Sequence, residues 1–137
     1  MQENTITADA EKQAEKMSEQ FDILLSMPPK KFLSWLDKNF YIKLPTYAVN
    51  DAEDMTNAAQ LMTILTNRYS YLCSFLSYAK IATREAKRNG GKAAYEDMVD
   101  KRDSIETMVS AVKQEYAAVS RAVTIHVENN AELKMVQ

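Results

Sequence analysis

The stretch KRNGGKA at residues 87–93 contains the only two glycines of the 137-residue chain, Gly90 and Gly91. Glycine adopts the left-handed conformation that ends a helix without steric cost. Two glycines and three prolines are few for this length, as is typical of mostly helical chains. We therefore expect one long helix to end at these glycines and a second to return antiparallel to it.

Apolar residues recur every three or four positions on both sides of the glycines. This spacing keeps them on one stripe of a helix, where a partner helix can cover them. The first row is Ala58, Met62, Leu65, Tyr69, Leu72, Leu76 and Ala79, and the second is Tyr95, Met98, Ile105, Val109, Val112, Tyr116, Val119 and Val123. The two rows predict a coiled-coil-like hairpin, with helices over about 51–89 and from 92 into the low 120s.

The ends of this hairpin carry weaker signals. Asn50 is the expected N-cap of the first long helix, with Glu53 as its capping-box partner. At the far end, Val123–Val127 is rich in β-branched residues and Asn129-Asn130 is a turn signal. The conformation of residues 124–137 is therefore left open.

Residues 1–49 predict a helical arm made of two shorter helices. Thr7 is the expected cap of the first, and Pro28-Pro29 separates the two, because proline ends a helix but suits the start of the next. The apolar faces are Ala10, Ala14, Met17, Phe21 and Leu24 in the first helix, and Phe32, Trp35, Leu36 and Phe40 in the second. Tyr41–Val49 reads as an extended connection. The whole chain, 1–137, is thus expected to be a single all-α domain with an arm (1–49) and a hairpin (50–137).

The first long helix has a second apolar row beside the first: Leu61, Ile64, Tyr71, Phe75, Tyr78 and Ala82. One partner helix cannot cover both rows. Either the N-terminal helices cover the second row within the chain, or another protomer does. Because exposed apolar area on this scale favours association, we expect a homo-oligomer.

The composition of the chain and the motifs that it lacks reduce the number of functions that fit the sequence. The net charge is −2, and no apolar run approaches the roughly 18 residues that span a bilayer. The N-terminus does not read as a secretory signal, and the single cysteine, Cys73, fits a reducing cytoplasm. A lone His126 cannot build a histidine metal site, and no phosphate-binding glycine loop is present. We expect no enzyme, and no catalytic, cofactor or metal residues.

Charge is the most function-like signal in the sequence. Between residues 68 and 92 stand six basic residues and one acid, Glu85. Flexible basic side chains hold phosphates without reading a base sequence. The candidate contact surface for a nucleic-acid backbone is Lys80, Arg84, Lys87, Arg88 and Lys92. Tyr78 is near enough to stack a base if its ring is exposed.

The alternative is that this basic cluster is a solvated helix end. The stretch that faces it across the hairpin contains the acids Glu96, Asp97, Asp100 and Asp103, which would neutralise it. Arg68 and Arg102 lie within apolar rows, so we expect their stems to pack at the edge of the helix pair with their charged heads in water.

Four segments resemble a known family: Asn57-Ala58-Ala59 before an apolar helix, the basic segment Ile81–Arg88, Asp100–Asp103, and Ser120–Ile125. They resemble small helical accessory proteins of tailed phages, in particular recombination mediators of the UvsY type. The resemblance covers about residues 55–135, and the first fifty residues have no counterpart.

This resemblance implies a protein that self-assembles into a ring, binds single-stranded DNA through the basic helix and helps to load a recombinase. Its partners would be single-stranded DNA and a recombinase or single-strand-binding protein, in the host cytoplasm. One competing interpretation is a phage structural or assembly protein, part of a virion, connector or scaffold, that uses the hairpin only as a packing surface. Another is a regulatory module that presents a helix face to one partner.

Overall fold

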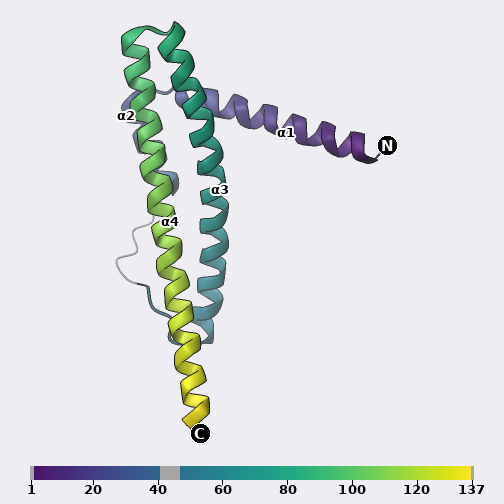
Figure 1. The fold of residues 1–137 in the computed structure, drawn as a ribbon, viewed down its shortest axis with the longest axis vertical. Coiled ribbons are helices and arrows are strands. Elements are labelled where there is room, and N and C mark those ends of the chain that lie inside the picture. Colours follow the sequence, from purple (N-terminus) through teal and green to yellow (C-terminus); the bar gives the residue numbers. More distant parts are fainter. Residues whose placement is uncertain (1, 41–46, 137) are drawn as a thin grey trace.

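The computed structural model describes residues 2–40 and 47–136, which form four helices and no strand (Figure 1). The helices are α1 (Gln2–Leu25), α2 (Pro29–Phe40), α3 (Ala52–Asn89) and α4 (Gly91–Val136). The two long helices, α3 and α4, lie side by side and run in opposite directions (Figure 1). The predicted all-α fold with a long antiparallel hairpin is confirmed.

The two glycines have different roles at the turn. Gly90 closes α3, because its backbone N–H donates to the carbonyl oxygen of Ala86 at 2.8 Å. Gly91 has a φ of 78°, and no other described residue has a positive φ. A Cβ at Gly90 would lie 3.0 Å from the Ala86 oxygen, whereas a Cβ at Gly91 would meet nothing within 4 Å. Position 90 therefore favours glycine because a side chain would crowd Ala86. Position 91 favours glycine because its backbone adopts a positive φ.

The N-cap of α3 differs from the prediction by one residue. Asp51, not Asn50, is the cap, and its side chain accepts a hydrogen bond from the Asp54 backbone N–H at 2.8 Å. The Asn50 backbone N–H donates in turn to the Asp54 carboxylate at 2.9 Å, so Asp54 replaces Glu53 as the capping partner. Two carboxylates at this end also interact favourably with the helix dipole.

Three other boundaries bear on the sequence predictions. α1 begins at Gln2, so the expectation that Thr7 caps it is wrong, and α2 begins at Pro29 as expected. α4 stays helical to Val136, because β-branched residues lower helix propensity only slightly. The expected extended connection falls mostly on residues 41–46, which lie outside the described residues.

The helix pair buries residues spaced by seven along both helices. On α3 and α4 these are Ala58, Leu65, Leu72 and Ala79, and Ile105, Val112 and Val119. The predicted rows are confirmed at these positions but not at Tyr69 and Tyr116, which are each 38% exposed. A tyrosine can pack its ring at the edge of a helix pair while its hydroxyl stays in water. The seam between α3 and α4 is therefore open at these two rings.

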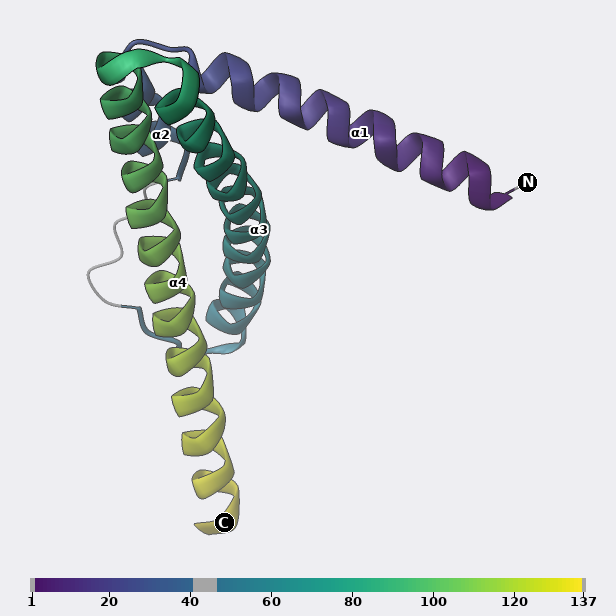
Figure 2. The ribbon, with the colours of Figure 1, turned by 45° about the horizontal axis from the view of Figure 1, so that its top comes forward.

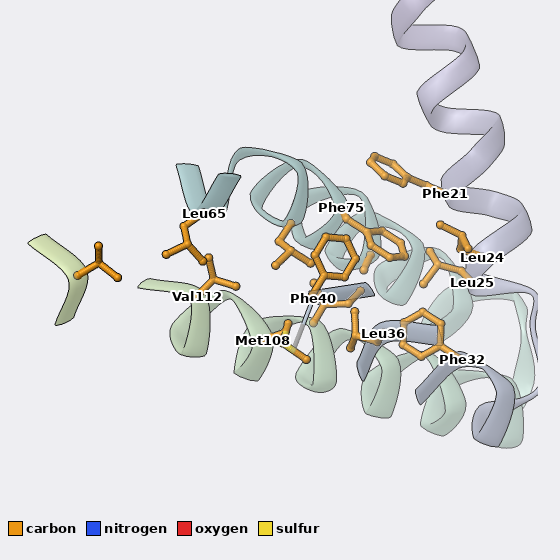
Figure 3. Close-up of a cluster of buried hydrophobic side chains, with 14 of the residues drawn as sticks. Phe21, Leu24, Leu25, Phe32, Leu36, Phe40, Leu65, Phe75, Met108 and Val112 are labelled. Carbon is orange, nitrogen blue, oxygen red and sulfur yellow. The ribbon is translucent and has the colours of Figure 1, made fainter. Parts of the chain in front are cut away.

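The chain itself covers part of the second apolar row of α3. Phe75 is fully buried, and its ring lies 4.7 Å from that of Phe21 in α1 and 6.1 Å from that of Phe32 in α2 (Figure 3). The ring of Trp35 in α2 also lies 6.1 Å from it. Farther from the turn, Ile64 of the same row remains exposed. The N-terminal helices thus cover the half of the row nearer the turn within one protomer.

Most of α1 extends away from the hairpin (Figure 2). Its buried side chains are Phe21, Leu24 and Leu25, close to its C-terminal end, whereas Ala10, Ala14 and Met17 of the predicted apolar face are exposed. The last turns of α4 also extend beyond α3 (Figure 1). Two helical segments of this chain therefore lack a covering helix in the part of the chain that the structure describes.

A buried lysine of α4 forms hydrogen bonds to the segment that connects α1 and α2. The Lys101 Nζ donates to the carbonyl oxygens of Leu25 and Met27, both at 2.7 Å, and to the Asp97 carboxylate at 2.8 Å. The last carbonyls of a helix have no partner within it. Lys101 therefore satisfies acceptors at the end of α1, a role that the sequence analysis did not find.

A hydrogen bond between α1 and α3 makes stability sensitive to alkaline pH. The Tyr78 hydroxyl donates to the Asp22 carboxylate, which raises the pKa of Tyr78 from 10.0 to about 12. A raised pKa means that the protonated phenol is stabilised by folding, so this contribution is complete below pH 10 and is lost as the pH approaches 12.

We therefore expect Tyr78→Phe to lose less stability than the parent protein between pH 10 and about 12, the interval set by these pKa values. Urea midpoints followed by circular dichroism at both ends of this interval measure the difference. All other residues are the same in both proteins, so the comparison between variant and parent isolates Tyr78. Equal losses in the two proteins would contradict this assignment.

Candidate nucleic-acid interface

A polar groove lies between α3 and α4 near the hairpin turn, with a volume of about 420 Å³. α3 contributes Lys80, Thr83, Arg84 and Lys87, and α4 contributes Tyr95, Arg102 and Glu106. We call these seven residues the basic groove. The α3 residues share one face because they are spaced by three and four, and Thr83 is buried at its floor with its hydroxyl donating to the Ala79 carbonyl at 2.7 Å.

The basic groove contains three of the five predicted contact residues: Lys80, Arg84 and Lys87. Arg88 and Lys92 are exposed outside it. Lys92 Nζ lies 4.0 Å from a carboxylate oxygen of Glu96, and such an exposed ion pair contributes little to stability. The predicted surface is therefore divided, with three residues in one groove and two beside the turn.

Arg102 is a fourth cation in the basic groove, supplied by α4. Its guanidinium lies 3.1 Å from the Asp103 carboxylate, and its side chain is about one-third exposed. The expectation that Arg102 lies at the edge of the helix pair is confirmed. Arg102 was not among the predicted contact residues, and its position within an apolar row was the one sequence signal that singled it out.

The acids of α4 pair with cations on α4, not with those on α3. Asp97 binds Lys101, Asp103 binds Arg102, and Glu96 lies near Lys92. Asp100 borders a separate hollow beside α2. Within residues 2–40 and 47–136, no ion pair joins these acids to the basic residues of α3. The predicted neutralisation across the hairpin is not observed, and Glu106 is the acid inside the groove.

Tyr78 is not available to stack a base. It precedes Lys80 by two residues, which is about 200° of helical rotation and places it on the other side of α3. Its ring packs on Phe21 with centroids 5.5 Å apart, and its hydroxyl is bound to Asp22. Tyr95 is the aromatic residue that lines the basic groove instead.

Arg68, the other arginine within an apolar row, lies half-buried farther along the seam. Glu115 on α4 is close enough for its pKa to be affected by Arg68. Burial raises the pKa of Glu115, and the positive charge of Arg68 lowers it in part. Both side chains are half-buried and neither lines the basic groove, so Arg68 adds no charge there.

Among the described residues, no three histidine, cysteine, aspartate or glutamate side chains gather closely enough to hold a metal ion. None of the described helices has an apolar segment of the length and hydropathy needed to cross a bilayer.

Comparison of this chain with protein-family models, curated proteins and solved structures found no match. The fold and the site define its class directly: an all-α helical hairpin that carries a basic groove beside its turn.

Proposed function

We propose that this protein is a non-enzymatic accessory protein that binds single-stranded DNA through its basic groove. The observation that carries the proposal is the set of three α3 cations, Lys80, Arg84 and Lys87, that line one groove and have no ion-pair partner in the described chain. Arg102 lines the opposite wall, but its guanidinium is paired with Asp103, so the three α3 residues supply the unpaired positive charge of the groove.

The physical basis is the release of counterions. Each phosphate that a lysine or arginine neutralises frees condensed cations, so binding is strong at low salt and independent of base sequence. Cations already paired inside the protomer would contribute much less. The resemblance to recombination mediators extends the proposal to loading a recombinase, in contact with that recombinase or a single-strand-binding protein, in the host cytoplasm.

Self-assembly is part of this proposal, and the charge of α1 supports it. The exposed part of this helix carries the acids Asp9, Glu11, Glu15 and Glu19 against two lysines. It extends from the hairpin without a covering helix (Figure 2). An acidic helix of one copy is complementary in charge to the exposed lysines of α2 in another copy, Lys30, Lys31 and Lys38, which favours contact between copies and leaves the basic groove free for DNA.

The proposal is tested with a triple variant, Lys80→Ala, Arg84→Ala and Lys87→Ala. For single strands, each lost phosphate contact reduces the slope of log affinity against log salt by about 0.7, so the slope should fall by about two. We expect affinity for a 12-nucleotide oligo(dT), chosen within the range of about 4–16 nucleotides covered by known single-strand sites, to fall about tenfold. Fluorescence anisotropy over a salt series measures both quantities.

The matched control removes three exposed lysines outside the groove, Lys12, Lys16 and Lys31, and should leave the slope nearly unchanged. Glu106→Gln removes the acid in the groove and should tighten binding roughly two- to fivefold, as expected for an exposed charge pair. If the parent protein shows no DNA binding at low salt, the proposal is wrong.

In that event the second candidate function, a phage structural or assembly protein, takes its place. The observation that favours it is the exposed apolar surface on the uncovered helical segments, including Ile23 of α1 and Leu133 and Met135 of α4. The virion, a connector or a scaffold would then provide the covering surface. Absence of salt-dependent retention on single-stranded DNA separates this candidate from the first.

A further inference from the structure

A second hollow, with a volume of about 350 Å³, lies in the seam between α3 and α4 farther from the turn. It is lined by Leu65, Thr66 and Tyr69 of α3 and by Val112, Lys113 and Tyr116 of α4. We call it the tyrosine hollow. Its volume lies within the range of about 300–1,000 Å³ that is typical of small-molecule sites.

The tyrosine hollow and the basic groove lie on the same face of the hairpin. Tyr69 precedes Lys80 by 11 residues, and Lys113 follows Arg102 by 11 residues. Eleven residues complete three helical turns to within about 20°, so each pair shares one side of its helix. The rise over 11 residues is about 16 Å, so one strand of a few nucleotides can extend from the groove to the hollow.

The two tyrosine rings in this hollow are available for stacking. Tyr69 and Tyr116 are each 38% exposed, and neither contacts another aromatic ring among the described residues. Tyr71 and Tyr78, by contrast, pack on Phe21 on the other side of α3. A phenol is uncharged at neutral pH, so neither ring repels phosphates.

We infer that the tyrosine hollow takes unpaired bases of the same strand whose phosphates lie in the basic groove. This inference rests on the proposed function and specifies its ligand as a single strand. Bases stack on aromatic rings whatever their identity, and the lysine beside the rings, Lys113, contacts the backbone between them. The bases of a duplex are already stacked inside it, so they do not reach the rings.

The test compares oligo(dT) with an abasic oligonucleotide of equal length and charge, 12 nucleotides each within the range of known single-strand sites. We expect the parent protein to bind oligo(dT) at least about tenfold more tightly than the abasic strand. Tyr69→Leu with Tyr116→Leu keeps apolar side chains and helix propensity but removes both rings. This double variant should bind the two strands within about twofold, with the salt slope of the parent, because the phosphate contacts remain.

A matched control replaces two exposed apolar residues outside the hollow, Ile23→Ala with Leu33→Ala, and should keep the parent's preference for bases.

Two results would separate this inference from the proposed function. If the parent binds both strands equally and its salt slope depends on the basic groove, this inference is overturned and the proposed function stands. A base preference that survives in the double tyrosine variant overturns it too. If the double tyrosine variant sediments differently from the parent but keeps its preference for oligo(dT) over the abasic strand, the inference is overturned and the hollow is a contact between copies. If neither strand binds at low salt, the proposed function fails and this inference with it.

Discussion

Replacing Phe75 with alanine is expected to lower the free energy of unfolding by about 3–5 kcal/mol, the usual cost of removing a buried aromatic side chain. Phe75 is fully buried, and its ring contacts those of Phe21 and Phe32 (Figure 3). It also contacts the rings of Trp35 and Tyr71. The variant therefore leaves a cavity at the point where three helices meet. We also expect a weaker near-ultraviolet circular dichroism signal, because the remaining rings lose their fixed arrangement.

Urea denaturation followed by far-ultraviolet circular dichroism measures this loss. Ile81→Ala is the matched control on the same helix, since Ile81 is 53% exposed and its truncation should cost well under about 1 kcal/mol. A Phe75→Ala protein with a midpoint close to that of the control would contradict the packing of α1 and α2 against α3. The long helices should stay helical in native buffer, because α3 and α4 also pack through residues far from Phe75.

Lys101→Met is expected to destabilise the fold by roughly 3 kcal/mol, because removing one partner of a buried polar network leaves the others unsatisfied. The Lys101 side chain is only 4% exposed, and its Nζ binds two carbonyl oxygens and the Asp97 carboxylate. Methionine keeps the volume of the apolar stem, so the change removes mainly the charge and its hydrogen bonds. Asp97 already has one buried oxygen without a partner, and the variant would leave the second without its lysine.

The same urea experiment measures this effect, with Lys92→Met as a control for the loss of a lysine on α4. Lys92 is almost fully exposed, so its replacement should change stability by less than about 1 kcal/mol. Adding Asp97→Leu to Lys101→Met should recover part of the loss, because it removes the unpaired carboxylate. Equal urea midpoints for Lys101→Met and Lys92→Met would show that the hydrogen bonds of Lys101 to the α1–α2 connection do not stabilise the fold.

The hairpin was predictable from the sequence because its determinants are local. Gly91 adopts the positive φ of the turn without steric cost, Gly90 fits where a side chain would crowd Ala86, and the spacing by three, four and seven reflects the helical repeat itself. The same repeat placed Lys80, Arg84 and Lys87 on one face. Pro29 at the start of α2 is another local signal, since proline suits the first position of a helix.

Only the tertiary structure decided which side chains meet across the helices. Charge counts along the chain suggested that the acids of α4 neutralise the basic cluster. Ion pairs depend on rotation about each helix axis, however, and Glu96, Asp97 and Asp103 pair with cations on α4 itself. For the same reason Tyr78 turned toward α1, whereas Tyr69 and Tyr116 came to the open edge of the seam. The burial of Lys101 depends on carbonyls about 75 residues away in sequence, at the end of α1. Periodicity thus determined the elements of this protein, and the relative rotation of the packed helices determined the composition of its site.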